Sequence, residues 1–166
     1  MRDKSLVSIV TPSFNQGRFL EETIQSVLSQ DYPHIEYMIV DGGSTDGSVD
    51  IIRRYQDRLA WWVSEPDRGQ TDAINKGFAR ARGSILAWIN SDDTYLPGAV
   101  SEAVEFLEAN PKIGMVYGNA NLIDEQGKLL GCFPARQTDY RKLRRGYVHI
   151  PQQATFFRAD LWRQVG

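Results

Sequence analysis

The chain has 166 residues, of which 42% are hydrophobic and 24% are charged, which is typical of a folded globular domain and excludes a disordered chain. Its net charge of −2 excludes a broad basic surface, so no nucleic-acid partner is expected. The single cysteine, Cys132, excludes an intrachain disulfide and a cysteine-built zinc site. The N-terminus lacks a signal-peptide core, and no stretch approaches the roughly 20 apolar residues that span a bilayer. We therefore expect a soluble, cytoplasmic protein.

Short apolar runs alternate with helical patterns along the chain. Strands are predicted at 6–11, 37–40, 61–63, 85–89 and 115–117. Helices are predicted at 20–28, 49–55 with Ser48 as N-cap, 71–81, and from Pro97 to the Asn110-Pro111 break. This alternation predicts an α/β fold with a mostly parallel sheet that helices cover on both faces.

The segments that follow the first four strands form a second pattern. In such sheets, ligands bind outside the carboxyl ends of the strands. The four segments are polar, and most of them carry glycine, proline or carboxylates; they span residues 11–17, 41–47, 64–70 and 90–93. Four turns of this kind on one sheet edge predict a ligand site.

Asp92 and Asp93 stand directly after an apolar strand. Adjacent carboxylates repel each other unless a cation or a donor separates them, and oxygen ligands suit magnesium or manganese. The alternative is that both residues cap the helix that starts at Pro97, where acidic residues favour the helix dipole.

Other residues in or near these turns also have two interpretations. Asp41 could accept hydrogen bonds from a base or ribose, or it could cap a flexible turn. Phe14 could stack on a base, or it could belong to the core. Arg68 and Lys76 could neutralise a pyrophosphate, or they could be solvated.

Several familiar active-site motifs are missing from the sequence. There is no G-x-G-x-x-G after the first strand and no G-x-x-x-x-G-K-[ST] loop, which excludes the dinucleotide and Walker fingerprints. Neither a G-x-S-x-G elbow nor an H-E-x-x-H helix occurs.

Five stretches together resemble the family-two inverting glycosyltransferases of the GT-A fold, and the resemblance covers nearly the whole chain. They are Ser-Ile-Val-Thr-Pro-Ser-Phe-Asn (8–15), Val-Asp-Gly-Gly-Ser-Thr-Asp-Gly-Ser (40–48), Gly-Gln-Thr-Asp-Ala-Ile-Asn-Lys-Gly (69–77), Trp-Ile-Asn-Ser-Asp-Asp (88–93) and Pro-Gln-Gln-Ala-Thr-Phe-Phe (151–157). Each motif alone is modestly specific. Their order and spacing carry the resemblance.

The resemblance implies roles for particular residues. Those that would line the nucleotide pocket or lie around the base, ribose and phosphates are Thr11, Pro12, Phe14, Asn15, Asp41, Gly43, Asp67, Arg68, Asp72 and Asp92. Asp93 would hold a divalent cation, magnesium or manganese, that bridges the two donor phosphates. Asp92 and Asp93 are thus the expected catalytic residues within this chain.

The implied reaction moves a sugar from a nucleoside-diphosphate sugar, with a UDP-sugar favoured, to a hydroxyl of a saccharide or lipid-linked acceptor. The implied setting is the synthesis of surface polysaccharide or glycoconjugate. The metal would act as a Lewis acid on the departing nucleoside diphosphate. Inversion needs a carboxylate base, which in similar proteins lies beyond the equivalent of residue 166. We therefore expect that this chain is a truncated form that lacks the base.

Three positions depart from the family pattern. Gly42 and Asn90 stand where acidic residues are frequent, and Ile74 stands where arginine is frequent. These departures bear on the choice of nucleotide, on the number of acidic metal ligands and on the neutralisation of the phosphates.

We expect one GT-A-like domain over residues 1–166, with a nucleotide-sugar-binding part at about 1–118 and the start of an acceptor-side region at about 119–166. One alternative function is a sugar nucleotidyltransferase, although residues 11–15 poorly match the basic, glycine-rich loop it needs. A non-catalytic nucleotide-sugar-binding module is another. The segment 136–145 carries five cations and could contact an anionic lipid surface at the inner face of the membrane, or it could be a solvated basic helix.

Overall fold

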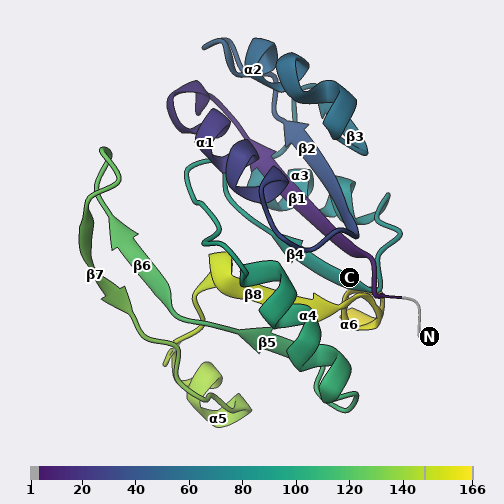
Figure 1. The fold of residues 1–166 in the computed structure, drawn as a ribbon, viewed down its shortest axis with the longest axis vertical. Coiled ribbons are helices and arrows are strands. Elements are labelled where there is room, and N and C mark those ends of the chain that lie inside the picture. Colours follow the sequence, from purple (N-terminus) through teal and green to yellow (C-terminus); the bar gives the residue numbers. More distant parts are fainter. Residues whose placement is uncertain (1–3, 148, 166) are drawn as a thin grey trace.

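The computed structural model describes residues 4–147 and 149–165. The expectations that rest on Met1–Asp3 and on Gly166 fall outside these residues. The chain forms a six-stranded sheet with helices on both faces, and a two-stranded hairpin projects from one side (Figure 1).

The central sheet has the strand order β3-β2-β1-β4-β8-β5. Its strands are β1 (Val7–Ser13), β2 (Ile35–Asp41), β3 (Trp61–Ser64), β4 (Ile85–Trp88), β5 (Met115–Tyr117) and β8 (Thr155–Arg158). β1 is parallel to β2 and β4, and β2 is parallel to β3, whereas β8 is antiparallel to both of its neighbours. The predicted α/β fold with a mostly parallel sheet is therefore confirmed, and β8 is a strand that the sequence pattern did not indicate.

Helices cover both faces of this sheet. The helices on one face are α1 (Gly17–Leu28), α2 (Ser48–Tyr55) and α4 (Ala99–Ala109), and those on the other are α3 (Gln70–Phe78) and α6 (Ala159–Val165). Side chains of β1 divide between the two cores, since Val7 and Ile9 pack with the first group and Val10 with the second. This division explains why apolar residues stand on both faces of the strand, because both faces are buried.

Glycine sets the start of two helices, of which α2 begins one residue earlier than predicted and α4 two residues later. Ser48 is the first residue of α2, and its N-cap is Gly47 with φ at 93°. α4 starts at Ala99 after Gly98, whose φ is 83°, and not at Pro97. Both glycines adopt the left-handed conformation, which is costly for other residues.

For the segment between β5 and β8, the only element considered from the sequence was a basic helix at 136–145. The segment forms the hairpin of β6 (Ala120–Ile123) and β7 (Leu129–Phe133), followed by the short helix α5 (Tyr140–Arg144). Two 3-10 turns complete the structure, η1 (Gln56–Arg58) and η2 (Gln152–Ala154). Within residues 4–147 and 149–165, no helix is long and apolar enough to cross a membrane.

Candidate functional site

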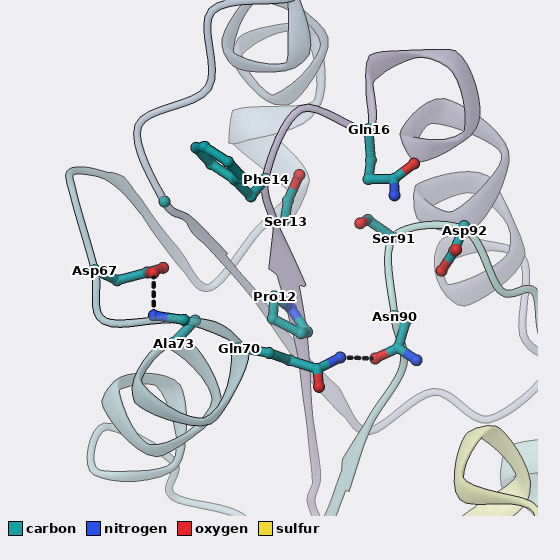
Figure 2. A pocket seen from close by; sticks show the side chains of 12 residues that line it. Pro12, Ser13, Phe14, Gln16, Asp67, Gln70, Ala73, Asn90, Ser91 and Asp92 are labelled. Atoms are coloured by element: carbon teal, nitrogen blue, oxygen red, sulfur yellow. Dashed lines mark hydrogen bonds between the residues drawn. The ribbon is translucent and has the colours of Figure 1, made fainter.

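A pocket of about 530 Å³ lies at the carboxyl ends of β1, β2, β3 and β4 (Figure 2). It is lined by Pro12, Ser13, Phe14, Gln16, Gly42, Asp67, Gly69, Gln70, Ala73, Asn90, Ser91 and Asp92. Each of the four polar segments singled out in the sequence, or the start of the helix after it, contributes to this lining. The prediction that they meet at one sheet edge is confirmed.

One wall of the pocket combines an aromatic ring, a glycine and a carboxylate. Phe14 is 61% exposed, which rules out the core alternative for its side chain. A Cβ atom on Gly42 would lie 2.9 Å from Oδ2 of Asp67 and 3.3 Å from a ring carbon of Phe14. The missing side chain of Gly42 therefore leaves room for the Asp67 carboxylate, whose Oδ1 accepts a hydrogen bond of 2.7 Å from Gly69 N–H.

Ser13 is a lining residue that the sequence did not single out. Its side chain is 4% exposed, and its Oγ has no hydrogen-bond partner among the described residues. Figure 2 draws it between Phe14 and Pro12 on the pocket wall. A buried hydroxyl without a partner is costly, so a ligand with a polar group at this wall would be favoured.

The turn after β2 owes its shape to Asp41. This carboxylate is fully buried and accepts hydrogen bonds from Gly43 N, from Ser44 N and Oγ, and from Ser64 Oγ. Its acceptor positions are therefore used within the protein, as the turn-capping interpretation of Asp41 expects.

Asn15 links this turn to the turn after β1. Its backbone N–H donates to Ser44 Oγ at 2.8 Å, and its Oδ1 accepts from Thr45 N–H at 3.0 Å. Asn15 also has a positive φ of 52°, which asparagine tolerates better than most residues. These bonds fix the segment that carries Phe14.

Of the residues predicted for the site, only some line the pocket. Those in the lining are Pro12, Phe14, Asp67 and Asp92. Those outside the lining are Thr11, Asn15, Asp41, Gly43, Arg68, Asp72 and Asp93. Thr11 is buried beneath the pocket, where its hydroxyl lies 2.9 Å from the Tyr37 hydroxyl.

Arg68 and Lys76, for which the sequence left open a role at a pyrophosphate or a solvated position, are held in ion pairs beside the pocket. Arg68 contacts Asp72 at 2.9 Å, and Lys76 contacts Glu65 at 2.8 Å. The hydrogen bond from Arg68 lowers the pKa of Asp72 below its usual range. None of the twelve residues that line the pocket is a lysine or arginine, so its charge comes from Asp67 and Asp92.

Asp92 is exposed at the pocket and Asp93 is half-buried behind it. Burial raises the pKa of Asp93, the negative charge of Asp92 raises it further, and a hydrogen bond of 3.2 Å from Asn90 Nδ2 partly offsets both effects. Because α4 starts only at Ala99, neither aspartate caps it, and the capping alternative is wrong.

The carboxylates of Asp92 and Asp93 fit a hard divalent cation that is bound jointly by the protein and by the substrate. Within the described parts of the chain, no group of three or more histidine, cysteine, aspartate or glutamate side chains is arranged for a metal. Magnesium and manganese, however, are usually bound by one or two carboxylates together with substrate phosphates. A cation would also relieve the repulsion by Asp92, which adds to the larger effect of burial in raising the pKa of Asp93.

A larger hollow of about 860 Å³ adjoins the first pocket at Asp92. It lies between α4 and the strands β5 and β6, with Asp93 in its wall. Apolar side chains form much of its lining, among them Leu96, Phe106 and Ile123. The two acidic residues therefore stand where the two hollows meet.

Residues 8–164 match the family described as glycosyl transferase family 2. The chain belongs to this family. The resemblance found in the motifs is thereby confirmed, and the match spans both the strand-end turns and the segment around β8.

Several curated relatives carry related names. An uncharacterized glycosyltransferase of Mycobacterium tuberculosis, Rv1514c, is 34% identical over 169 residues, covering 100% of this chain and 63% of the relative. The putative teichuronic acid biosynthesis glycosyltransferase TuaG of Bacillus subtilis is 39% identical over 107 residues, covering 63% of this chain and 42% of TuaG. The chain thus spans less than two thirds of the length of either relative.

Solved structures share the fold. The mannosyltransferase PcManGT from Pyrobaculum calidifontis, in complex with GDP-Man and Mn²⁺, has a TM-score of 0.74 at 24% identity, covering 99% of this chain and 48% of that one. TarS 1–349 of S. aureus, in complex with UDP-GlcNAc, has a TM-score of 0.75 at 18% identity, covering 96% and 47%. The predicted GT-A type of α/β fold is confirmed by these neighbours.

Proposed function

We propose that this chain is the donor-binding part of a metal-dependent, inverting glycosyltransferase that takes a nucleoside-diphosphate sugar, with a UDP-sugar favoured. The observation that carries the proposal is the acidic pocket at the strand ends, which combines an exposed aromatic ring with carboxylates and has no lysine or arginine in its lining. Family membership and two neighbours whose structures contain GDP-Man or UDP-GlcNAc support it.

The nucleotide is assigned to the wall formed by Phe14, Gly42 and Asp67. The exposed ring of Phe14 offers a face for stacking on a base. Oδ2 of Asp67, which lies over Gly42, accepts a hydrogen bond from a base N–H, and the unpartnered hydroxyl of Ser13 supplies a donor. We propose that Thr11, Asn15, Asp41 and Gly43, which lie outside the lining, act by shaping these turns.

Charge balance supports a divalent cation. A nucleoside diphosphate would add negative charge to a pocket that already contains Asp67 and Asp92. Arg68 is paired with Asp72, so it offsets little of that charge. We propose that Asp93, with Asp92 beside it, would hold magnesium or manganese, which when bound would act as a Lewis acid on the departing nucleoside diphosphate.

The chain's own residues then hold the donor for in-line attack. Phe14 and Asp67 fix the base, Asp92 faces the ribose, and the acceptor hydroxyl approaches from the hollow that adjoins Asp92. We propose the division into a donor part, about 1–118, and the start of an acceptor-side region, about 119–166. The expected position of the general base, beyond residue 166, stays a prediction.

The two alternative functions differ in how the findings bear on them. The match to glycosyl transferase family 2 favours sugar transfer over the sugar nucleotidyltransferase. The non-catalytic binding module is separated from an enzyme by measuring hydrolysis of the bound donor without acceptor.

The expected contact of segment 136–145 with a membrane also stays a prediction. Tyr140 and the cations of α5 are exposed, which is compatible with either of its interpretations. Sedimentation with vesicles of anionic phospholipid, compared with neutral vesicles, would test it, and equal recovery in both supernatants would count against it.

Calorimetric titration tests the donor site. UDP, GDP and dTDP are each titrated with Mn²⁺ and with chelator, on the wild type, on Asp93→Ala and on the control Asp50→Ala, which changes an exposed aspartate paired with Arg53. We expect one nucleotide to bind only with Mn²⁺, and Asp93→Ala to weaken that binding by at least about tenfold. A cooperatively folded wild type that binds no nucleotide under any condition would overturn the proposal.

A further inference from the structure

The side chains of Gln70, Asn90 and Gln152 form a continuous hydrogen-bonded chain across the sheet edge. Gln70 Nε2 donates to Asn90 Oδ1 at 2.7 Å, a bond that Figure 2 shows at the pocket. Asn90 Nδ2 donates to Gln152 Oε1 at 3.1 Å, and Gln152 Nε2 donates to the backbone carbonyl of Trp88 at 2.7 Å. Three amides from α3, the turn after β4, and η2 are thus linked.

The direction of every hydrogen bond among these three amides follows from the last bond, which Gln152 makes to Trp88. The carbonyl oxygen of Trp88 can only accept, so the group of Gln152 that faces it is the NH₂ group. Oε1 of Gln152 must then accept from Asn90, which presents its own NH₂ group. A backbone carbonyl therefore settles the amide orientations that side chains alone would leave ambiguous.

Asn90 uses its NH₂ group twice. One bond goes to Gln152 and the other, of 3.2 Å, goes to Oδ2 of Asp93. The backbone of Asp93 is fixed separately, because its N–H donates to the Asn90 carbonyl at 3.1 Å and its carbonyl accepts from Thr23 Oγ1 at 2.8 Å. The remaining freedom of Asp93 is the rotation of its carboxylate, which the bond from Asn90 restrains.

We propose that Gln152 is a positioning residue for Asp93 and acts through Asn90. Gln152 selects the orientation of Asn90 in which an N–H, and not the carbonyl oxygen, faces the carboxylate of Asp93. With the orientation reversed, the Asn90 oxygen would lie against that carboxylate and repel it. The segment before β8, far along the chain from the strand-end turns, thereby becomes part of the site.

The inference rests on the proposed function only where it concerns the metal. Partners that orient a metal ligand typically change metal affinity by 10–100-fold when they are removed. Gln152→Met keeps the length of the side chain and removes both hydrogen bonds. The matched control is Gln25→Met, which removes the bond of 2.9 Å from Gln25 Nε2 to the Tyr55 hydroxyl, away from the site.

Two measurements test the proposal. In the metal-free chain, NMR of the Asn90 side-chain amide and of the Asp93 carboxyl carbon should differ between Gln152→Met and wild type, and should not differ in Gln25→Met. With Mn²⁺ and the nucleoside diphosphate that binds, Gln152→Met should weaken Mn²⁺ binding, followed by electron paramagnetic resonance, by about tenfold. In an Asn90→Ala background the same change should cause no further loss.

The possible results separate the two proposals. Unchanged Asn90 and Asp93 signals in a folded Gln152→Met chain would overturn the positioning role, whatever the metal does. Losses that add in the double variant would overturn the route through Asn90. A wild type that binds neither Mn²⁺ nor nucleotide would overturn the proposed function, while the metal-free signals would still decide the role of Gln152.

Discussion

The central sheet and the β6–β7 hairpin bury their side chains very differently. β1 is buried at all seven of its residues, and β2 at all but the first. In β6 only Ala120 is buried, and β7 has one half-buried residue, Gly131, among exposed ones. The sheet is therefore held by packing on two faces, whereas the hairpin depends on pairing between its own strands and a few polar contacts.

This difference bears on the site. Three of the four turns that form the pocket extend from the buried strands β1, β2 and β4, and the fourth follows the half-buried β3, so the scaffold fixes their positions. The hairpin lines the adjoining hollow through residues such as Asn121 and Ile123, and it contacts the body through the exposed pair Arg18–Glu125. We infer that the strand-end pocket is rigid and that the adjoining hollow, which the hairpin lines, is the more adaptable of the two.

Truncating one leucine in each region should give the largest contrast. Leu107 of α4 is fully buried in the core cluster, while Leu130 of β7 is 66% exposed. Leu107→Ala should lower the free energy of unfolding by about 3 kcal/mol, because it removes buried methyl groups and leaves a cavity. Leu130→Ala should change it by less than about 0.5 kcal/mol. Urea unfolding measures both, and similar losses would show that the hairpin has a core of its own.

The same difference explains how far the sequence could predict the fold. The strands that were predicted lie in the packed sheet, where burial imposes an apolar run such as that of β2. β6 and β7 are mostly exposed and obey no such pattern, and β8 is a run of only four residues between the 3-10 turn η2 and the helix α6. β6 and β7 pair with each other without a buried face that would impose periodicity, and β8 pairs with strands distant in the sequence.

The candidate site also contains features that the sequence could predict and features that it could not. The four turns were predictable because the carboxyl ends of parallel strands share one edge. The unpartnered hydroxyl of Ser13 was not predictable, because it depends on what surrounds a buried atom. Gln152 reaches Asn90 only because β8 lies antiparallel beside β4, and no sequence signal indicated β8.

The same comparison can be made by removing the charge of one glutamate in each region. Glu36 of β2 is 5% exposed and accepts hydrogen bonds from Ser8 Oγ and from the N–H and Nε of Arg82. Burial acts to raise the pKa of Glu36, but these bonds and the charge of Arg82 outweigh it and hold the pKa below 4.5. The charged form therefore stabilises the folded chain above about pH 4.5, and this contribution is lost as the pH falls through the lower, folded pKa.

Glu36→Gln should therefore cost about 2 kcal/mol at neutral pH, and the difference from wild type should shrink as the pH falls below 4.5. Glu125→Gln, which breaks a pair whose side chains are 59% and 64% exposed, should stay within about 0.5 kcal/mol at every pH. Urea unfolding from pH 7 to pH 3 measures both. A difference for Glu36→Gln that does not vary with pH would contradict the assignment of its stabilisation to the charged carboxylate.

Removing one hydroxyl where the two regions join should give the smallest effect. The hydroxyl of Tyr117, at the end of β5, donates to the Arg136 carbonyl at 3.1 Å and accepts from Thr138 N–H at 3.3 Å. Tyr117→Phe should cost about 1 kcal/mol, felt locally because the segment after the hairpin has little other packing. Hydrogen exchange at the Thr138 amide should then be faster by about fivefold, with no change at the amide of Ile9 in β1. Faster exchange at both amides would mean that the two regions open as one unit, and the contrast between a rigid sheet and an adaptable hairpin would be wrong.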